Sequence, residues 1–312
     1  KQLKSRGVLL TACSKNDEEI ARQAFGHPDA VLKLDDFDFF KANWNPKHGN
    51  IVETAEELNI GLDSLVFVDD NPAEREIVRK NLPEVTVPEI GDEVSRYIEY
   101  IDRAAYFEPT ELSAEDIKRS AMYSANSQRK RLESSFEDYE DYLRTLEMRA
   151  EIDRFPSVFM ERITQLVNKT NQFNLTTRRY TRPELDSLRN SEDHVTLYGR
   201  LDDKFGTNGL VTVIIGEVLG QSLSITLWVM SCRVFGRNME FAMFDALRHE
   251  CRERDLTEIL GHYYPTKRNG LVADLYGRLG FELVEQKDSG DSSWRYRIPD
   301  DYHPMNYVIE CS

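Results

Sequence analysis

The sequence predicts a mixed α/β protein, with a helix-covered parallel sheet first and an α+β domain after it. In the first third, short apolar segments such as 8–13 and 64–68 alternate with helices, which is typical of buried parallel strands. In the second half, strand-like segments follow one another with fewer helices between them, which favours antiparallel pairing. We expect domains at 1–108 and 148–312, joined by a polar, helical linker at 109–147.

The first domain is expected to alternate between the two element types. Residues 1–7 are typical of the end of a helix that leads into a strand. The expected strands are 8–13, 31–34, 64–68 and 85–87. The expected helices are 16–25, 46–58, 72–81 and 92–104. Asp17, Glu18 and Glu19 stand at the start of the first of these helices, where the helix dipole favours acidic side chains.

The second domain is expected to be richer in strands. The expected strands are 149–153, 173–177, 194–201, 210–218, 222–230, 259–264, 281–284 and 294–298. The expected helices are 158–167, 239–252 and 271–279. We find no internal repeat and no low-complexity tract.

Composition excludes several classes of protein. The net charge of −15 argues against nucleic-acid binding, because a basic surface supplies most of the affinity for nucleic acid. No apolar run approaches the ~20 residues that a membrane span needs. The four widely spaced cysteines are typical of reduced thiols, so we expect a cytoplasmic protein. The chain begins at Lys1 without a signal-peptide pattern, and we expect its natural start to be missing.

Two adjacent acids, Asp69 and Asp70, follow the apolar segment 64–68. Capping of the next helix by Asp70 or Asn71 accounts for one carboxylate but not for both. Two carboxylates at the end of a buried strand repel each other unless a cation compensates them. Ligands of open α/β sheets also lie beyond the carboxyl ends of the strands, so we predict a metal site here.

Ser14, Lys15 and Asn16 follow the apolar segment 8–13. The Ser14 hydroxyl and neighbouring N–H groups can hold a phosphate at a helix start, although a simple helix cap is the alternative. Lys47 begins the helix 46–58, where a cation opposes the helix dipole. Neutralising a bound phosphoryl group would explain this lysine, and a solvated surface lysine is the alternative.

Cys13 and a polar run in the second half are further candidates. A thiol beside a helix N-terminus and a lysine would favour the nucleophilic thiolate, although most single cysteines are inert core residues. Cys232 offers a second thiol, and a buried structural role is the alternative. The polar run predicts a substrate cleft or, alternatively, satisfies the backbone of a tight connection. Its residues are Asn168, Lys169, Asn171, Gln172 and Asn174.

A basic turn opens the helix 239–252. Arg233, Gly236 and Arg237 could present side chains and N–H groups to a pyrophosphate, or they could form a structural turn. His262 and the neighbouring Tyr263 and Tyr264 end a strand nearby. A general acid or base role for His262 stands beside the alternative of a hydrogen-bonded core histidine.

Several long strings resemble the subfamily IIIC domain of the HAD superfamily, and more specifically the FkbH-like proteins of polyketide assembly lines. In chain order these strings are 12–17 (ACSKND), 44–47 (WNPK), 66–75 (VFVDDNPAER), 168–177 (NKTNQFNLTT) and 231–237 (SCRVFGR). The resemblance covers nearly the whole chain. It implies a HAD-like Rossmannoid parallel sheet in the first domain.

The resemblance also implies roles for the residues of the first domain. Ser14, Lys47 and the pair Asp69/Asp70 match the second, third and fourth motifs of the superfamily. Ser14 would bond the phosphoryl group, Lys47 would neutralise it, and the acids would hold Mg²⁺. The first motif, an Asp-x-Asp segment on the first strand, is absent, so we expect the chain to be inactive alone.

FkbH-like proteins take the glyceryl group of 1,3-bisphosphoglycerate, a glycolytic acyl phosphate, remove phosphate and load the unit on an acyl carrier protein as a thioester. By this resemblance the chain would be a hydrolase and acyltransferase, with Cys13 as the thioester relay. Segment 233–238 resembles the acyl-CoA-binding turn of GNAT acetyltransferases, with Asn238 in place of a small residue. Asn269 and Tyr276 match later positions of that fold.

The second domain would therefore be a GNAT-like α+β domain that receives the phosphopantetheine arm of a carrier protein or of coenzyme A. Two alternatives stay open. One is an acyl-CoA-dependent acyltransferase with a vestigial HAD half, and the other is a non-catalytic module that docks carrier protein.

Overall fold

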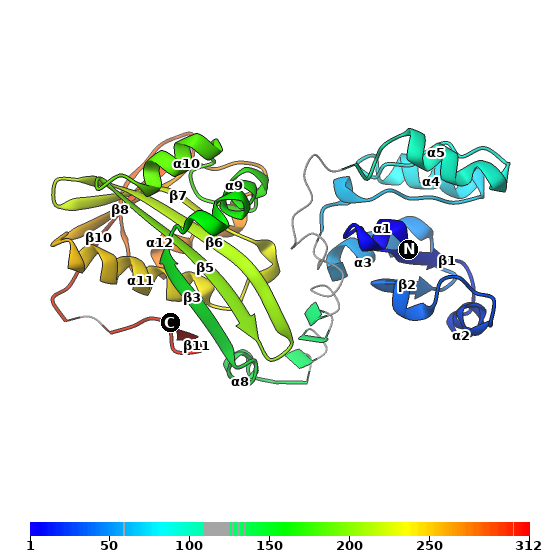
Figure 1. The fold of residues 1–312 in the computed structure, drawn as a ribbon, viewed down its shortest axis with the longest axis horizontal. Coiled ribbons are helices and arrows are strands. Elements are labelled where there is room, and N and C mark those ends of the chain that lie inside the picture. Colours follow the sequence, from blue (N-terminus) through cyan, green and yellow to red (C-terminus); the bar gives the residue numbers. More distant parts are fainter. Residues whose placement is uncertain (59, 109–124, 127, 130–131, 134, 302) are drawn as a thin grey trace. The chain divides into compact units, whose positions relative to one another are not determined.

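The computed structural model describes residues 1–58, 60–108, 125–126, 128–129, 132–133, 135–301 and 303–312. Within it the chain has a mixed α/β fold and divides into two compact units, Lys1–Lys130 (unit 1) and Arg131–Ser312 (unit 2) (Figure 1). Much of the expected linker, residues 109–124, lies outside the described residues. Its final part contains the helix α8, as expected for a helical segment.

Unit 1 alternates short strands and helices, as predicted. Its helices are α1 (Gln2–Ser5), α2 (Glu18–Gln23), α3 (Lys47–Leu58), α4 (Pro72–Asn81) and α5 (Tyr97–Arg103). Its strands are β1 (Thr11–Ser14) and β2 (Phe39–Ala42). Short 3₁₀ turns lie at 24–26, 34–36, 62–64 and 94–96. The small core of this unit consists of Ile51, Phe67, Val78, Leu82 and Val85.

The strand pairing of unit 1 is parallel, which confirms the prediction. β1 pairs with β2 from Thr11↔Phe39 to Ser14↔Ala42. A second parallel contact joins Val66 to Thr86, so the expected strands 64–68 and 85–87 are reduced to a single bridge. Within the described part of the chain, no ladder connects these two pairs.

The expected strand at 31–34 is wrong. A 3₁₀ turn occupies Leu34–Asp36, and the strand lies further on, at Phe39–Ala42. The Asp36 carboxylate accepts a hydrogen bond from the Lys33 backbone N–H at 2.9 Å, which keeps the chain turned here. Such local side-chain bonds compete with strand pairing, and the apolar pattern of 31–34 did not reveal this competition.

Unit 2 is built on a large sheet with the strand order β11-β3-β5-β6-β7-β8-β10-β9, and β4 also pairs with β7. Its strands are β3 (Met148–Arg154), β4 (Phe173–Asn174), β5 (His194–Asp203), β6 (Gly206–Leu219), β7 (Ser222–Met230), β8 (Glu258–Tyr263), β9 (Glu282–Gln286), β10 (Ser292–Arg297) and β11 (Ile309–Cys311). Most neighbours are antiparallel, and the pairs β7–β8 and β11–β3 are parallel.

Helices cover both faces of this sheet (Figure 1). They are α8 (Tyr139–Thr145), α9 (Met160–Lys169), α10 (Arg182–Arg189), α11 (Met239–Glu253) and α12 (Leu275–Arg278). The core on one face includes Met243, Phe244 and Leu247 of α11, and the core on the other includes Met160 and Ile163 of α9. In the described part of the chain no helix is both long and apolar enough to span a membrane.

The sequence analysis missed two elements, α10 and β11. α10 begins with a capping box in which Thr181 and Glu184 bond each other's backbone N–H groups. This Thr-x-x-Glu pattern, with a proline early in the helix, was an available signal. β11 is only three residues long and carries no such pattern.

Gly199 of β5 lies where α11 packs closely on the sheet. A Cβ there would come within 2.5 Å of Met239 Cε and 2.7 Å of Thr212 Cγ2. We therefore expect Gly199→Ala to lower the free energy of unfolding by about 1–3 kcal/mol, measured by urea denaturation. Gly277→Ala is the matched control, because its Cβ would lie 3.9 Å from the Trp294 ring. A destabilisation no larger than that of the control would contradict the close packing.

Candidate functional site

A buried ion pair joins the start of α3 to the end of the segment that carries Val66. Lys47 Nζ lies 2.5 Å from Asp69 Oδ2, and only 12% and 5% of the two side chains are exposed. Asp69 Oδ1 accepts a second hydrogen bond from the Asn71 backbone N–H at 3.0 Å. Buried charges are tolerated only when they are paired and hydrogen-bonded, and both conditions hold here. Lys47 and Asp69, both expected at the site, therefore lie in direct contact.

Asp69 and Asp70 have different environments. Asp69 is buried, whereas Asp70 is exposed to solvent. The buried Arg75 of α4 donates from Nη1 to the Asp69 carbonyl at 2.8 Å and to the Asp70 carbonyl at 3.1 Å. Arg75 thus holds the backbone of both acids in place. Of the two carboxylates, Asp69 is the one that pairs with Lys47.

The predicted magnesium ligands do not complete a metal site among the described residues. These residues contain no group of three His, Cys, Asp or Glu side chains that could hold a metal ion. Lys47 and the Asn71 N–H already engage the two oxygens of Asp69. Magnesium requires near-octahedral oxygen coordination, which this donor set does not supply.

Cys13 lies on β1 beside this ion pair. Its thiol donates a long hydrogen bond to the Lys47 carbonyl at 3.9 Å. Burial raises the pKa of Cys13, and the charges of Asp69 and Glu74 raise it further. A hydrogen bond from Asn50 and the charge of Lys47 act in the opposite direction without cancelling the effect of burial. The expectation of a favoured thiolate is therefore wrong for the free chain, whose thiol is held protonated.

The sequence analysis missed a pair of asparagines, one of which, Asn50, forms a hydrogen bond with the Cys13 side chain. Asn50 is 1% exposed, and its amide exchanges two hydrogen bonds with Asn43, at 2.8 and 3.1 Å. The Asn43 backbone N–H donates to the Ser14 carbonyl at 3.1 Å, which ties β2 to the end of β1. Asn50 stands on the buried stripe of α3 with Thr54 and Leu58, and a polar residue on an apolar helix face was the available signal.

The predicted phosphate-binding residues have separate partners. Lys15 Nζ forms an ion pair with Glu74 Oε1 at 2.6 Å. The Asn16 carboxamide oxygen accepts from the Asp17 N–H at 2.8 Å. The Ser14 hydroxyl makes no side-chain hydrogen bond within the part of the chain that the structure describes. Phosphate binding by these three residues stays a prediction.

Glu74 is a site residue whose role the sequence analysis missed. The cap of α4 is Asn71, whose side-chain oxygen accepts a hydrogen bond from the Ala73 N–H. The Glu74 carboxylate instead pairs with Lys15, and its Oε2 is buried without a hydrogen-bond partner among the described residues. The charges of Asp69 and Glu74 both raise the pKa of the Cys13 thiol.

The basic turn of unit 2 is tied into the protein. Arg237 is 7% exposed and donates to the Asn208 carboxamide oxygen at 3.1 Å and to Asp203 Oδ2 at 3.3 Å. The Gly236 carbonyl accepts from the Tyr139 hydroxyl at 3.0 Å. Arg233 Nε donates to the Ser231 hydroxyl at 3.2 Å. These contacts are those of a structural turn, and pyrophosphate binding here stays a prediction.

Asn269 and Tyr276, the other predicted pantetheine-binding residues, are buried. The Asn269 amide donates to the carbonyls of Asn174 and Tyr264, both at 2.9 Å, and accepts from the Thr266 N–H at 2.6 Å. The Tyr276 hydroxyl accepts from the His262 N–H at 3.3 Å, and burial raises its pKa. Both side chains serve the packing of unit 2 in this structure.

His262 and Cys232 also have internal environments. His262 lies within 3.2 Å of the Ser224 hydroxyl and 3.4 Å of the Ser293 hydroxyl, and burial lowers its pKa. It has the contacts of a hydrogen-bonded core histidine. Burial also raises the pKa of Cys232, which agrees with the structural alternative for this thiol.

The polar run at 168–174 has the contacts of a tight connection. Asn168 donates to the carbonyls of Thr164 and Tyr180, at 2.9 and 2.8 Å. The Arg179 guanidinium donates hydrogen bonds to the Thr170 carbonyl at 2.7 Å and to the Asn171 carboxamide oxygen at 2.6 Å. Asn174 is buried, whereas Asn168, Lys169, Asn171 and Gln172 are exposed. A role in a substrate cleft stays a prediction for these residues.

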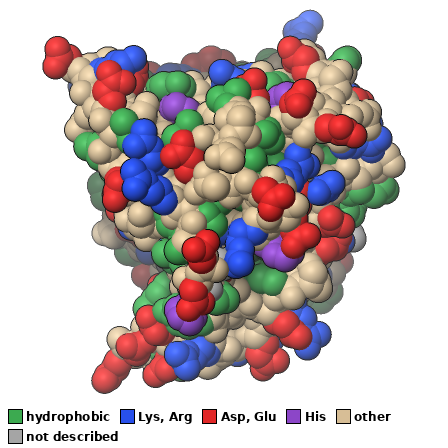
Figure 2. All heavy atoms as spheres, turned by 90° about the vertical axis from the view of Figure 1, so that its left-hand side faces the viewer, with side chains coloured by type: hydrophobic (Ala, Val, Ile, Leu, Met, Phe, Trp, Pro, Cys, Tyr) green, Lys and Arg blue, Asp and Glu red, His purple; other side chains and the backbone are tan. Residues whose placement is uncertain are grey.

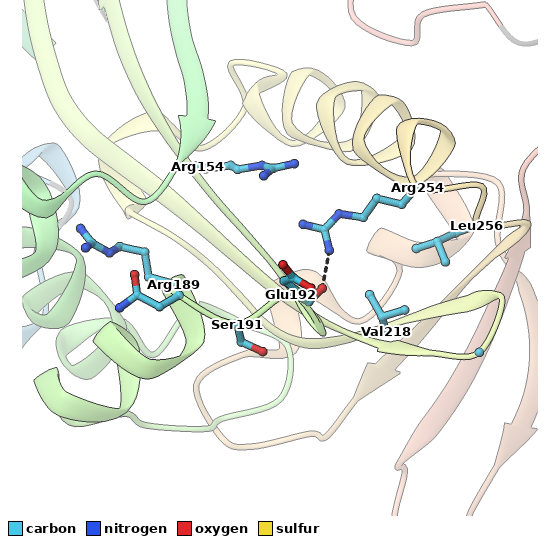
Figure 3. A pocket seen from close by; sticks show the side chains of 9 residues that line it. Arg154, Arg189, Ser191, Glu192, Val218, Arg254 and Leu256 are labelled. Atoms are coloured by element: carbon cyan, nitrogen blue, oxygen red, sulfur yellow. Dashed lines mark hydrogen bonds between the residues drawn. The ribbon is translucent and has the colours of Figure 1, made fainter.

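A pocket of about 550 Å³ in unit 2 lies apart from these residues (Figure 3). Its lining consists of Arg154, Arg189, Asn190, Ser191, Glu192, Val218, Gly220, Arg254 and Leu256. Arg254 donates to the Glu192 carbonyl at 2.8 Å and to Glu250 at 2.9 Å, and Arg154 also pairs with Glu250. One face of the molecule shows acidic and basic side chains interspersed (Figure 2).

Comparisons with known proteins give similarity to solved structures alone. Neither a protein-family model nor a curated protein matches the chain. One similar structure is the N-terminal part of a Bacteroides fragilis protein, which contains a phosphatase domain complexed with Mg. It is 46% identical over 36% of this chain and 30% of that chain, with a TM-score of 0.35.

Other similar structures are acetyltransferases. The ribosomal-protein-S18-alanine N-acetyltransferase of Escherichia coli is 11% identical over 51% of this chain and 99% of that chain, with a TM-score of 0.38. The PaiA N-acetyltransferase of Thermoplasma acidophilum in complex with coenzyme A is 11% identical over 47% and 98%, with a TM-score of 0.36. The similar structures thus include a phosphatase domain and N-acetyltransferases.

The Lys47–Asp69 pair predicts a large difference between two neighbouring substitutions. Asp69→Asn leaves the buried Lys47 ammonium unpaired, so we expect a loss of about 3–5 kcal/mol in the free energy of unfolding. Asp70→Asn, on the exposed neighbour, should change it by less than about 0.5 kcal/mol. Urea denaturation measures both. Equal losses in the free energy of unfolding for the two variants would show that the Lys47–Asp69 ion pair does not stabilise the fold.

The environment of Cys13 predicts its reactivity. Because thiolate is the reactive form, iodoacetamide should alkylate Cys13 more slowly than an exposed thiol at neutral pH. Lys47→Met should move the alkylation profile to higher pH, and Glu74→Gln should move it to lower pH, since the two charges act oppositely on the thiol pKa. Mass spectrometry of the Cys13 peptide reads the rates. Shifts in the same direction for both variants would contradict the assigned charges.

Proposed function

We propose that the chain is an FkbH-like glyceryl transferase and phosphatase. It would take the three-carbon unit of 1,3-bisphosphoglycerate, release phosphate and pass the unit to an acyl carrier protein as a thioester. The observation that carries the proposal is the position of the Cys13 thiol beside the buried Lys47–Asp69 pair. A nucleophile on β1 beside a cation at the start of α3 suits a substrate that carries a reactive acyl group on a phosphate.

The proposed transfer proceeds in two displacements. The Cys13 thiol loses its proton to solvent and its sulfur forms a bond to the acyl carbon. The bond from that carbon to the phosphate oxygen breaks, and phosphate leaves with the electron pair. The phosphate ester at C3 is lost in a separate hydrolysis, in which water attacks the phosphorus, the bond from phosphorus to the C3 oxygen breaks and that oxygen takes up a proton. The thiolate of the carrier's phosphopantetheine arm then attacks the enzyme thioester, and Cys13 departs as a thiolate that takes up a proton.

The lysines and Ser14 have defined tasks in this proposal. Lys47 Nζ stabilises the negative charge of the departing phosphate, in exchange for part of its interaction with Asp69. Ser14 donates a hydrogen bond to the same phosphate, and Lys15 and Asn16 border it. Asp69 and Asp70 remain the chain's predicted magnesium ligands. The two displacements do not require that these residues bind magnesium.

Unit 2 would serve the carrier protein in this proposal. The acyl-CoA-dependent acyltransferase has less support, because the protein itself engages Arg237 and Asn269, which were expected to hold the coenzyme. The docking module has less support as well. It gives no reason for a buried lysine–aspartate pair to lie beside a cysteine in unit 1.

The test uses the chain extended at its N-terminus by an Asp-x-Asp strand, supplied with 1,3-bisphosphoglycerate, Mg²⁺ and holo carrier protein. We expect a glyceryl thioester on the carrier and a glyceryl adduct on Cys13, both read by intact-mass spectrometry. Cys13→Ala should abolish both products, whereas the matched control Cys232→Ala should form them normally. Glyceryl carrier formed at the normal rate by Cys13→Ala would place the relay elsewhere. No product from the unaltered extended chain would refute the reaction.

A further inference from the structure

The side-chain amide of Asn43 has a single possible orientation. The Asn45 backbone N–H lies 3.0 Å from one of its two terminal atoms. Because a backbone N–H can only donate, this atom is the carboxamide oxygen, and the other terminal atom is the NH₂ group. The Asn43 backbone N–H in turn donates to the Ser14 carbonyl at 3.1 Å. This bond places the amide at the end of β1, next to the residue that follows Cys13.

The orientation of Asn43 fixes that of Asn50. The Asn43 NH₂ group donates to Asn50 Oδ1 at 3.1 Å, and Asn50 Nδ2 donates to Asn43 Oδ1 at 2.8 Å. Turning the Asn50 amide over would bring oxygen against oxygen and nitrogen against nitrogen, and both hydrogen bonds would be lost. Asn50 is 1% exposed, so this loss would leave buried polar atoms without partners. The Asn50 NH₂ group therefore stays on one defined side.

The Asn50 NH₂ group has a second hydrogen for Cys13. Its first hydrogen is donated to Asn43, and the Cys13 side chain also forms a hydrogen bond with Asn50. This bond lowers the pKa of the thiol, which is the effect of a donor that favours the thiolate. The fold brings the two side chains together, because Cys13 Sγ lies 3.9 Å from the Lys47 carbonyl. Asn50 follows Lys47 by three residues on α3, and residues at this spacing share a helix face.

The other side chains that act on the Cys13 thiol carry charges. Lys47 of α3 favours the thiolate, whereas Asp69 and Glu74 disfavour it. Lys47 and Asp69 are paired with each other, so their effects on the sulfur partly cancel. A neutral donor in contact with the sulfur is not cancelled in this way. A donor that is already aimed at the place where charge develops is effective, because no reorganisation is needed during the reaction.

A thioester relay needs such a donor at two points, since its sulfur carries negative charge when it attacks the acyl carbon and again when the carrier thiolate displaces it. We propose that Asn50 is a positioning residue for Cys13, whose N–H, oriented by the Asn43 amide, holds the sulfur whenever it is a thiolate. Asn50 keeps its own protons throughout. The part that Asn50 takes in acyl transfer rests on the proposed function, whereas the hydrogen bond belongs to the chain without substrate.

Asn50→Leu tests the donor, because leucine has a similar shape and leaves the burial of the sulfur unchanged. Loss of a hydrogen bond to a charged sulfur should move the pH profile of Cys13 alkylation by about one unit to higher pH, which is an about tenfold lower rate with iodoacetamide at neutral pH. Mass spectrometry of the Cys13 peptide reads the rate. The exposed Cys311 of the same chain is the internal reference.

Asn43→Ala tests the orientation, because it keeps the Asn50 donor but removes the amide that aligns it. We expect a smaller shift of the Cys13 profile in the same direction. Thr54→Val is the matched control on the buried stripe of α3, since its hydroxyl donates to the Asn50 backbone carbonyl at 2.7 Å and not to the amide. It should leave the profile unchanged. Circular dichroism confirms that the variants are folded.

A Cys13 profile in Asn50→Leu that coincides with that of the unaltered chain would overturn the proposal. An equal shift in Thr54→Val would overturn it as well, because the effect would then come from a loosened helix. If Asn50→Leu does not fold, Asn43→Ala decides, and an unshifted profile in that variant refutes the oriented donor.

Acyl transfer is read separately in the chain extended by an Asp-x-Asp strand, where Asn50→Leu should load the carrier about tenfold more slowly than the unaltered extended chain. Loading at the normal rate would contradict the part of Asn50 in transfer. An absence of loading by the unaltered extended chain refutes the glyceryl reaction instead, and the alkylation profiles then decide on the hydrogen bond.

Discussion

The candidate site of unit 1 depends on the burial of two opposite charges, Lys47 and Asp69. Removing a charge from water is expensive, and the cost is offset only when its partner is held at contact distance. The start of α3 and the strand end at Asp69 are therefore fixed against each other. Arg75 reinforces this arrangement through the backbone of the acidic pair. The thiol of Cys13 lies in the electric field of both charges.

Unit 2 is governed by the pairing of strand edges. β8 pairs with only the first residues of β7, and the short strand β4 pairs with the last ones. The basic turn at 233–237 also has a structural role, because the Arg237 guanidinium donates hydrogen bonds to Asp203 and Asn208 of the neighbouring hairpin. Residues that resembled ligand-binding positions thus hold the fold together in this structure.

The sequence predicted the elements that rest on local patterns and missed those that rest on distant contacts. α4 was predicted within its observed bounds because Asn71 and Pro72 mark its start locally. The meeting of Lys47 and Asp69 followed from the rule that ligands gather beyond strand ends. The strand at 39–42 was misplaced because the Asp36–Lys33 bond that displaces it is invisible in an apolar pattern. The partners of Glu74 and Asn269 were missed because they lie far away in sequence.

The central claim is that Cys13 and Lys47 border one phosphoryl-binding position. Its most direct measurement is the rate of Cys13 alkylation in the presence of acetyl phosphate or inorganic phosphate. The account predicts that either anion slows alkylation of the unaltered chain in a saturable manner and leaves the rate in Lys47→Met unchanged. A rate that does not respond to phosphate in the unaltered chain, or that responds equally in both, would contradict it.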